Sequence, residues 1–152
     1  MENPRSVPRK SILVAAGPEV EERLQRVLTG HDLVIVRTLR EATDLLQRQE
    51  FGMVIADVHF EESQMFELLH HVRINRRDAA VPIVCILGGR RERRMSKVMV
   101  EGVNYAVKAM TANAFLDFAK MPDDDAGNGR LRKIIDYLVL LDGELHQGLQ
   151  DD

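Results

Sequence analysis

One carboxylate in this sequence stands where an α/β protein could use it for chemistry. Asp57 directly follows the apolar run 53–56, and the polar segment 58–63 comes after it. A short apolar run of this kind predicts a strand buried on both faces, as in a parallel sheet. In open α/β sheets ligands bind at the carboxyl ends of the strands, so Asp57 is the first candidate site residue. The alternative is a structural role, in which Asp57 begins a turn or caps the next helix.

A second charged residue follows the last predicted strand. Lys108 comes directly after the apolar segment Tyr105-Ala106-Val107. A carboxylate and an ammonium at the ends of neighbouring strands can form an ion pair, because neither group is then buried alone. Asp57 and Lys108 can therefore be a purely structural pair, and their presence alone does not establish a reaction.

The other candidate groups are weaker. His70 and His71 are consecutive, so they point in different directions on a helix and cannot chelate one metal. The segment 88–94 has two glycines and four arginines but no phosphate-loop lysine and hydroxyl. With Lys97, the four arginines Arg90, Arg91, Arg93 and Arg94 form a basic patch. This patch is either a solvated charged surface or a contact for protein or nucleic acid.

Composition limits the class of protein. The chain has 152 residues, of which 45% are hydrophobic, enough for the core of one domain. A net charge of -3 gives no global affinity for nucleic acid or an anionic membrane. The single cysteine, Cys85, excludes an internal disulfide framework. No apolar run approaches the ~18 residues of a membrane span, and segment 1–10 is polar, so we expect a cytoplasmic protein.

The elements that must position Asp57 alternate between strands and helices. Apolar runs predict strands at 11–16, 33–36, 53–57, 83–87 and 105–107, and helical periodicity predicts helices between them, the fourth at 91–101. Thr38 and Glu41 form a capping box for the second helix. We expect a flexible tail at 1–10, a domain at 11–142 and a tail at 143–152. Within the domain, 111–129 is predicted as an irregular insertion and 130–142 as the last helix.

This order of elements resembles the receiver domain of two-component response regulators over residues 10–108. The resemblance implies a flavodoxin-like, doubly wound (βα)5 fold with a parallel five-stranded sheet of order 2-1-3-4-5. It places the phospho-acceptor at Asp57, the lysine that contacts the phosphoryl group at Lys108, and the aromatic switch at Tyr105. In the family, a histidine kinase supplies the phosphoryl group and Mg2+ is bound beside the acceptor.

Several positions depart from the family pattern. The acidic pair that holds Mg2+ falls on Ala16 and Gly17, and the hydroxyl that ends the fourth strand falls on Leu87. Mg2+ needs several oxygen ligands, so Asp57 would hold it almost alone. Three glutamates, Glu19, Glu61 and Glu62, are the candidates that could restore a metal site, although their spacing differs from that of the family. We expect no bound metal or cofactor; the alternative is Mg2+ bound weakly at Asp57.

The sequence therefore favours an atypical receiver that is not an enzyme and acts by binding proteins in signal transduction or transcriptional control, without phosphorylation. The alternative is a phospho-accepting receiver with an unorthodox metal site, and a third hypothesis is nucleic-acid binding through the 90–97 patch, which we do not expect for this domain alone.

The expected partner is a signalling protein, such as a histidine kinase or a regulator. We also expect a homodimer through the fourth helix, fifth strand and last helix, with no membrane partner. Its interface residues would be Arg91, Arg94, Lys97, Val139 and Leu140.

Overall fold

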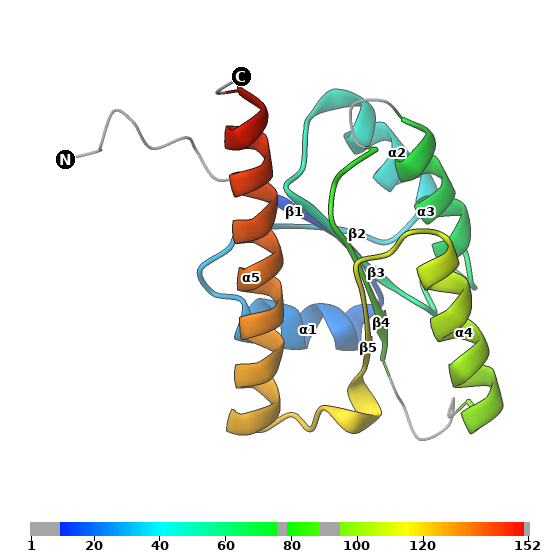
Figure 1. The fold of residues 1–152 in the computed structure, drawn as a ribbon. Helices are drawn as coiled ribbons and strands as arrows, with labels where there is room; N and C mark the ends of the chain where they lie inside the picture. The colour runs from blue at the N-terminus through cyan, green and yellow to red at the C-terminus, as the bar shows by residue number, and fades with distance from the viewer. Residues whose placement is uncertain (1–9, 76–78, 89–94, 151–152) are drawn as a thin grey trace.

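The computed structural model describes residues 10–75, 79–88 and 95–150. Its centre is one parallel sheet of five strands in the order β2-β1-β3-β4-β5, which confirms the predicted fold class (Figure 1). The strands are β1 (Ile12–Ala15), β2 (Leu33–Val36), β3 (Met53–Asp57), β4 (Ile83–Leu87) and β5 (Ala114–Asp117). Every residue of β1, β3 and β4 is buried. The central strands therefore need apolar side chains on both faces, as their sequences supply.

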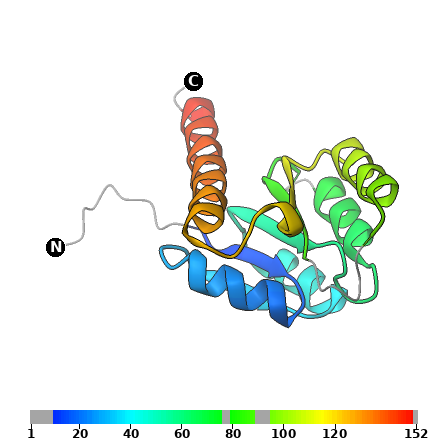
Figure 2. The same cartoon turned by 90° about the horizontal axis from the view of Figure 1, so that it is seen from below.

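Helices cover both faces of this sheet (Figures 1 and 2). They are α1 (Pro18–Val27), α2 (Leu39–Arg48), α3 (Met65–Ile74), α4 (Lys97–Ala109) and α5 (Asp125–Gln150). One core cluster lies between the sheet and α2, α3 and α4, and the other lies between the sheet and α1 and α5. The N-terminal cap of α2 at Thr38 is confirmed, because Thr38 Oγ1 accepts a hydrogen bond of 3.1 Å from the Glu41 amide. The Glu41 carboxylate accepts from the Arg37 amide and the Thr38 hydroxyl. No helix in the described segments is long and apolar enough to cross a membrane.

The prediction for the fourth helix and fifth strand was wrong. Tyr105-Ala106-Val107 belongs to α4, which continues through Gly102 to Ala109. Within this helix Val98 and Met99 face away from the core and are 78% and 56% exposed. The fifth strand is instead β5, whose pairing with β4 begins at Val84 opposite Ala114. A three-residue apolar segment cannot distinguish a strand from one face of a helix, so only this long-range pairing reveals the strand.

The predicted insertion at 111–129 is also wrong. It contains β5, the short 3-10 helix η2 (Phe118–Lys120) and the start of α5. Because α5 runs from Asp125 to Gln150, it replaces both the shorter helix at 130–142 and most of the tail predicted at 143–152. Its C-terminal part extends clear of the other elements in Figure 2. The predicted tail at 1–10 and the patch residues Arg90, Arg91, Arg93 and Arg94 lie outside the described residues, apart from Lys10.

Candidate functional site

Asp57 ends β3 in the middle of the carboxyl edge of the sheet, between β1 and β4. Its side chain is buried, with the residue only 5% exposed. Oδ1 accepts a 3.0 Å hydrogen bond from the His59 amide, and Oδ2 accepts a 3.5 Å bond from the Gly17 amide. The sequence therefore placed this residue correctly at the edge where α/β sheets bind ligands.

Burial controls the charge of Asp57. Removal from water raises the pKa of this carboxyl above its ordinary value, and the amides of His59 and Gly17 lower the pKa again in part. Desolvation outweighs these hydrogen bonds because backbone amides replace only some of the water that a carboxylate binds. The Gly88 amide and the charge of the His59 side chain lower the pKa of Asp57 as well, but the net direction stays upward, so the geometry presents a poorly solvated acid.

The expected metal positions carry no ligands. Ala16 and Gly17 follow β1 directly beside Asp57, and a Cβ built on Gly17 would lie 3.9 Å from Asp57 Oδ2. A carboxylate at residue 17 could therefore approach Asp57, and glycine leaves that space without an oxygen ligand. The Ala16 carbonyl instead accepts a 2.7 Å hydrogen bond from Arg37 Nη1. Arg37 also forms an ion pair with Glu21.

The glutamates considered as substitutes do not rebuild the site. Glu61 Oε2 accepts a 2.5 Å hydrogen bond from the Leu39 amide at the start of α2, so it points to that helix. Glu62 lines a shallow depression together with Arg40 and Thr43 of α2. Across the described segments, no three acidic, histidine or cysteine side chains form a group that could hold a metal ion. The residues present thus do not fit the Mg2+ site of a receiver.

The switch positions have also changed. Leu87 ends β4 and is buried, so an aliphatic side chain occupies the expected hydroxyl position. The prediction that Tyr105 lies in the fifth strand and Lys108 directly after it was wrong. Both residues lie on α4, where Lys108 is exposed and Tyr105 is 80% exposed. The ion pair considered between Asp57 and Lys108 is not among the ion pairs of the described residues. The residue that follows β5 directly is Phe118, and the aromatic three positions before it is Phe115.

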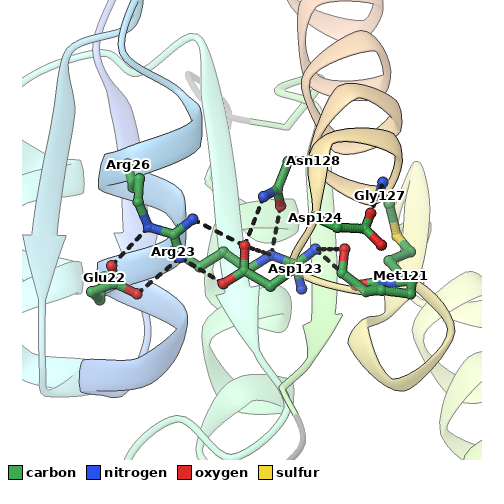
Figure 3. Close-up of polar contacts among 9 residues, drawn as sticks. Glu22, Arg23, Arg26, Met121, Asp123, Asp124, Gly127 and Asn128 are labelled. Atoms are coloured by element: carbon green, nitrogen blue, oxygen red, sulfur yellow. Dashed lines mark hydrogen bonds and ion pairs between the residues drawn. The ribbon is translucent and has the colours of Figure 1, made fainter.

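Phe118 is held by an arginine that the sequence did not reveal. Arg23 of α1 is only 6% exposed, and its guanidinium carbon lies 4.3 Å from the centroid of the Phe118 ring. Arg23 Nη2 donates to the carbonyl oxygens of Met121 and Pro122 at 2.7 and 3.0 Å. Its Nε donates to Asn128 Oδ1 at 2.9 Å (Figure 3). This set of contacts joins α1 to the connection between β5 and α5.

A second arginine reinforces this connection at the surface. Arg26 pairs with Asp123 at 2.6 Å and with Glu22 at 2.9 Å (Figure 3). Hydrogen bonds from Arg26 and from Asn128 lower the pKa of the Asp123 carboxyl, and the charge of Arg26 adds to this effect. Asp123 and Asp124, which fall in the predicted irregular insertion, therefore have structural roles. Asp124 Oδ1 accepts a 2.8 Å hydrogen bond from the Gly127 amide near the start of α5.

A shallow cleft lies beside these residues. Its lining includes Val20, Arg23, Gly88 and Phe118. A Cβ on Gly88 would lie 2.5 Å from Val20 Cγ2, so Val20 packs directly against the backbone after β4. The same lining holds three carboxylates, of Glu19, Glu22 and Asp123, against the one cation, Arg23. Negative charge therefore outweighs positive charge in this cleft, whereas a phosphoryl group would require positive charge.

The predicted interface residues fall into different environments. Lys97 is exposed at the first position of α4, Leu140 is 62% exposed, and Val139 is partly buried against the core. Tyr137 and Leu141 are also exposed, at 63% and 38%. The consecutive histidines of α3 also lie in different environments, because His70 is exposed and His71 has a buried Nε2 atom. No sequence signal identified Arg23 or Phe118, because their roles depend on where β5 ends.

Comparison with solved structures identifies the class of fold. No protein-family model matches the sequence, and no curated protein matches it significantly. The structure, however, is similar to those of response regulators and receiver domains. This similarity supports the resemblance stated from the sequence at the level of the fold, because the identities are low.

Three particular structures illustrate the match. A response regulator from Hahella chejuensis is 21% identical, covers 85% of this chain and 94% of its own, and has a TM-score of 0.68. The receiver domain of an HD domain-containing protein from Pseudomonas fluorescens Pf-5 is 16% identical, with coverages of 96% and 98% and a TM-score of 0.70. The receiver domain of a sensor histidine kinase from Pseudomonas aeruginosa PAO1 is 15% identical, with coverages of 86% and 98% and a TM-score of 0.61. That structure contains a coordinated magnesium ion.

Proposed function

We propose that this chain is an atypical receiver that acts as a protein-binding module in signal transduction without phosphorylation or enzymatic activity of its own. One observation carries the proposal: Asp57 is kept, but its expected partners are replaced by Ala16, Gly17, Leu87 and Phe118. Phosphoryl transfer depends mainly on positioning and positive charge at the phosphoryl oxygens. Those substitutions remove the metal ligands, the hydroxyl and the ammonium that would supply both.

Two exposed apolar surfaces support the binding role. One lies on α4 and includes Val98, Met99 and Tyr105; the other lies on α5 and includes Tyr137 and Leu140. Large apolar side chains that gather on a surface are typical of contacts with other proteins. We propose that these surfaces bind a signalling protein and a second copy of this chain. The expected homodimer through α4, β5 and α5 belongs to this proposal.

The test is phosphorylation in vitro. The intact mass of the protein is measured after incubation with acetyl phosphate and millimolar Mg2+, with Asp57→Asn as the control and a phosphorylatable receiver as the positive control. We expect no mass increase in the wild type. A single phosphoryl increment that is absent in Asp57→Asn would overturn the proposal and favour the alternative, a phospho-accepting receiver with an unorthodox metal site.

A further inference from the structure

The helix α4 is apolar on both sides. Its inner side packs Val100, Val103 and Val107 against the core. On its outer side Val98 and Tyr105 are 78% and 80% exposed. Large apolar side chains gathered on a solvent-facing side are typical of a surface that contacts another protein. The outer side of α4 is therefore a surface that another protein would cover.

Gly102 is exposed on this outer side and lies near the middle of α4 along its length. A glycine in a helix costs up to about 1 kcal/mol relative to alanine. No described glycine has a positive φ, and a Cβ on Gly102 would meet nothing within 4 Å. Neither backbone conformation nor packing within the described chain thus requires a glycine here. Close approach of another backbone at this position would require one.

The exposed residues follow the spacing of a helix–helix seam. Val98, Gly102, Tyr105 and Ala109 are separated by four, three and four residues, the a and d spacing of a coiled coil. All four are exposed. We propose that α4 packs antiparallel against α4 of a second copy, about a two-fold axis. This arrangement places Tyr105 opposite the partner's Gly102, and Val98 opposite the partner's Ala109, so that each large side chain meets a small one.

The charges beside the seam identify a second copy as the occupant. Glu101 and Lys108 are exposed, lie seven residues apart and flank the same side of the seam. Within the described residues, neither side chain forms an ion pair. Antiparallel packing brings Glu101 to the partner's Lys108, and Lys108 to the partner's Glu101. In a parallel pair Glu101 would face the partner's Ala106 and gain no opposite charge, so only the antiparallel orientation pairs these charges.

The size of this contact sets the expected affinity. With 13 residues, α4 is ~20 Å long. A single pair of helices of this length buries less than the ~1,600 Å² of a standard interface, so the dimer should be weak and depend on concentration. The inference narrows the self-association within the proposed function to α4 and leaves the exposed residues of α5 for a different protein. It does not depend on whether Asp57 accepts phosphate.

Charge reversal tests the geometry in the full chain by sedimentation equilibrium. We expect the wild type to self-associate, and Glu101→Lys and Lys108→Glu each to weaken association roughly tenfold or more, because each change creates two like-charge contacts. An equimolar mixture of these two variants should associate again, since both heterodimer contacts are attractive. The double variant Glu101→Lys/Lys108→Glu should also dimerise. Lys133→Glu, an exposed change on α5, is the matched control and should leave association unchanged.

Gly102→Ala provides a second readout that separates folding from association. The added methyl should raise the thermal stability of the monomer while it weakens the dimer, so the two measurements move in opposite directions. A wild type that is monomeric at high micromolar concentration would overturn the inference. Single reversals that associate like the wild type, or a mixture no better than its components, would also overturn it. Phosphorylation of Asp57 would contradict the proposed function and leave this interface unaffected.

Discussion

Arg23 and Phe118 form a cation-π contact at the carboxyl edge of the sheet, with 4.3 Å between the guanidinium carbon and the ring centroid. Arg23 comes from α1 and Phe118 directly follows β5, so the contact joins parts of the chain that are far apart in sequence. The ring is held by packing at the position where the resemblance implies a lysine aimed at the phosphoryl group. At this position the carboxyl edge of the sheet therefore has a contact that stabilises the fold, whereas the resemblance implies a lysine that contacts a phosphoryl group.

Loss of the Arg23 side chain should destabilise the protein. Arg23→Ala leaves the carbonyl oxygens of Met121 and Pro122 without this donor and removes the contact with Phe118. We expect the free energy of unfolding to fall by about 2 to 3 kcal/mol, measured by urea denaturation. The matched control is Arg26→Ala, whose exposed ion pairs should contribute much less. Equal effects of the two substitutions would contradict a special role for Arg23.

Removal of the Asp57 charge should stabilise the fold. Because burial raises the pKa of this carboxyl, the folded state holds its proton more tightly than the unfolded state. This contribution to stability is complete below the unfolded pKa and is lost as the pH rises through the folded pKa. Asp57→Asn should therefore raise the free energy of unfolding at pH 7 and leave it nearly unchanged at pH 3, as measured by urea denaturation at the two pH values. Destabilisation at pH 7 would indicate that the carboxylate has a stabilising partner.

Restoration of the missing groups should recover receiver chemistry in two stages. Ala16→Asp, Gly17→Asp and Leu87→Thr together supply oxygen ligands and a hydroxyl around Asp57, so this triple variant should bind Mg2+ in a calorimetric titration. Addition of Phe118→Lys should then permit phosphorylation by acetyl phosphate, detected as a mass increment.

The matched controls for this reconstruction are the triple variant that keeps Phe118, in which Lys108 stays on α4 away from the edge, and the triple variant with Ala119→Lys, at the exposed position next to Phe118. Neither control should accept phosphate. A triple variant that folds, as judged by circular dichroism, and shows no response to Mg2+ would mean that the edge around Asp57 has been assigned incorrectly.

Two glycines of α5 should respond in opposite directions to alanine. A Cβ on Gly127 would lie 1.9 Å from the Pro122 carbonyl oxygen, whereas a Cβ on Gly129 would meet nothing within 4 Å. Gly127→Ala must therefore displace the turn that Arg23 also holds, and we expect a loss of about 2 kcal/mol or more in the free energy of unfolding. Gly129→Ala should gain up to about 1 kcal/mol. Thermal unfolding checks both, and a neutral Gly127→Ala would show that the turn is free to move.

The sequence by itself determined the first four strands and the place of Asp57. Continuous apolar runs of four or five residues, ended by polar or turn residues, are typical of strands buried on both faces of a parallel sheet. Thr38 and Glu41 fixed the start of α2 because a helix cap is a local interaction. The departures from the receiver pattern at Ala16, Gly17 and Leu87 could also be predicted from the sequence, since these residues lie at the ends of strands whose limits were clear.

Only the tertiary structure decided where the fifth strand lies and which residues therefore complete the edge. The short run that ends at Val107 is part of α4, which extends beyond it on both sides. The segment Ala114–Asp117 forms the fifth strand because it pairs with β4. That shift of position removes Lys108 from the site and brings Phe118 and Arg23 to it. Local periodicity could not reveal this, because the pairing that selects β5 joins residues about thirty positions apart and is decided by packing of the whole sheet.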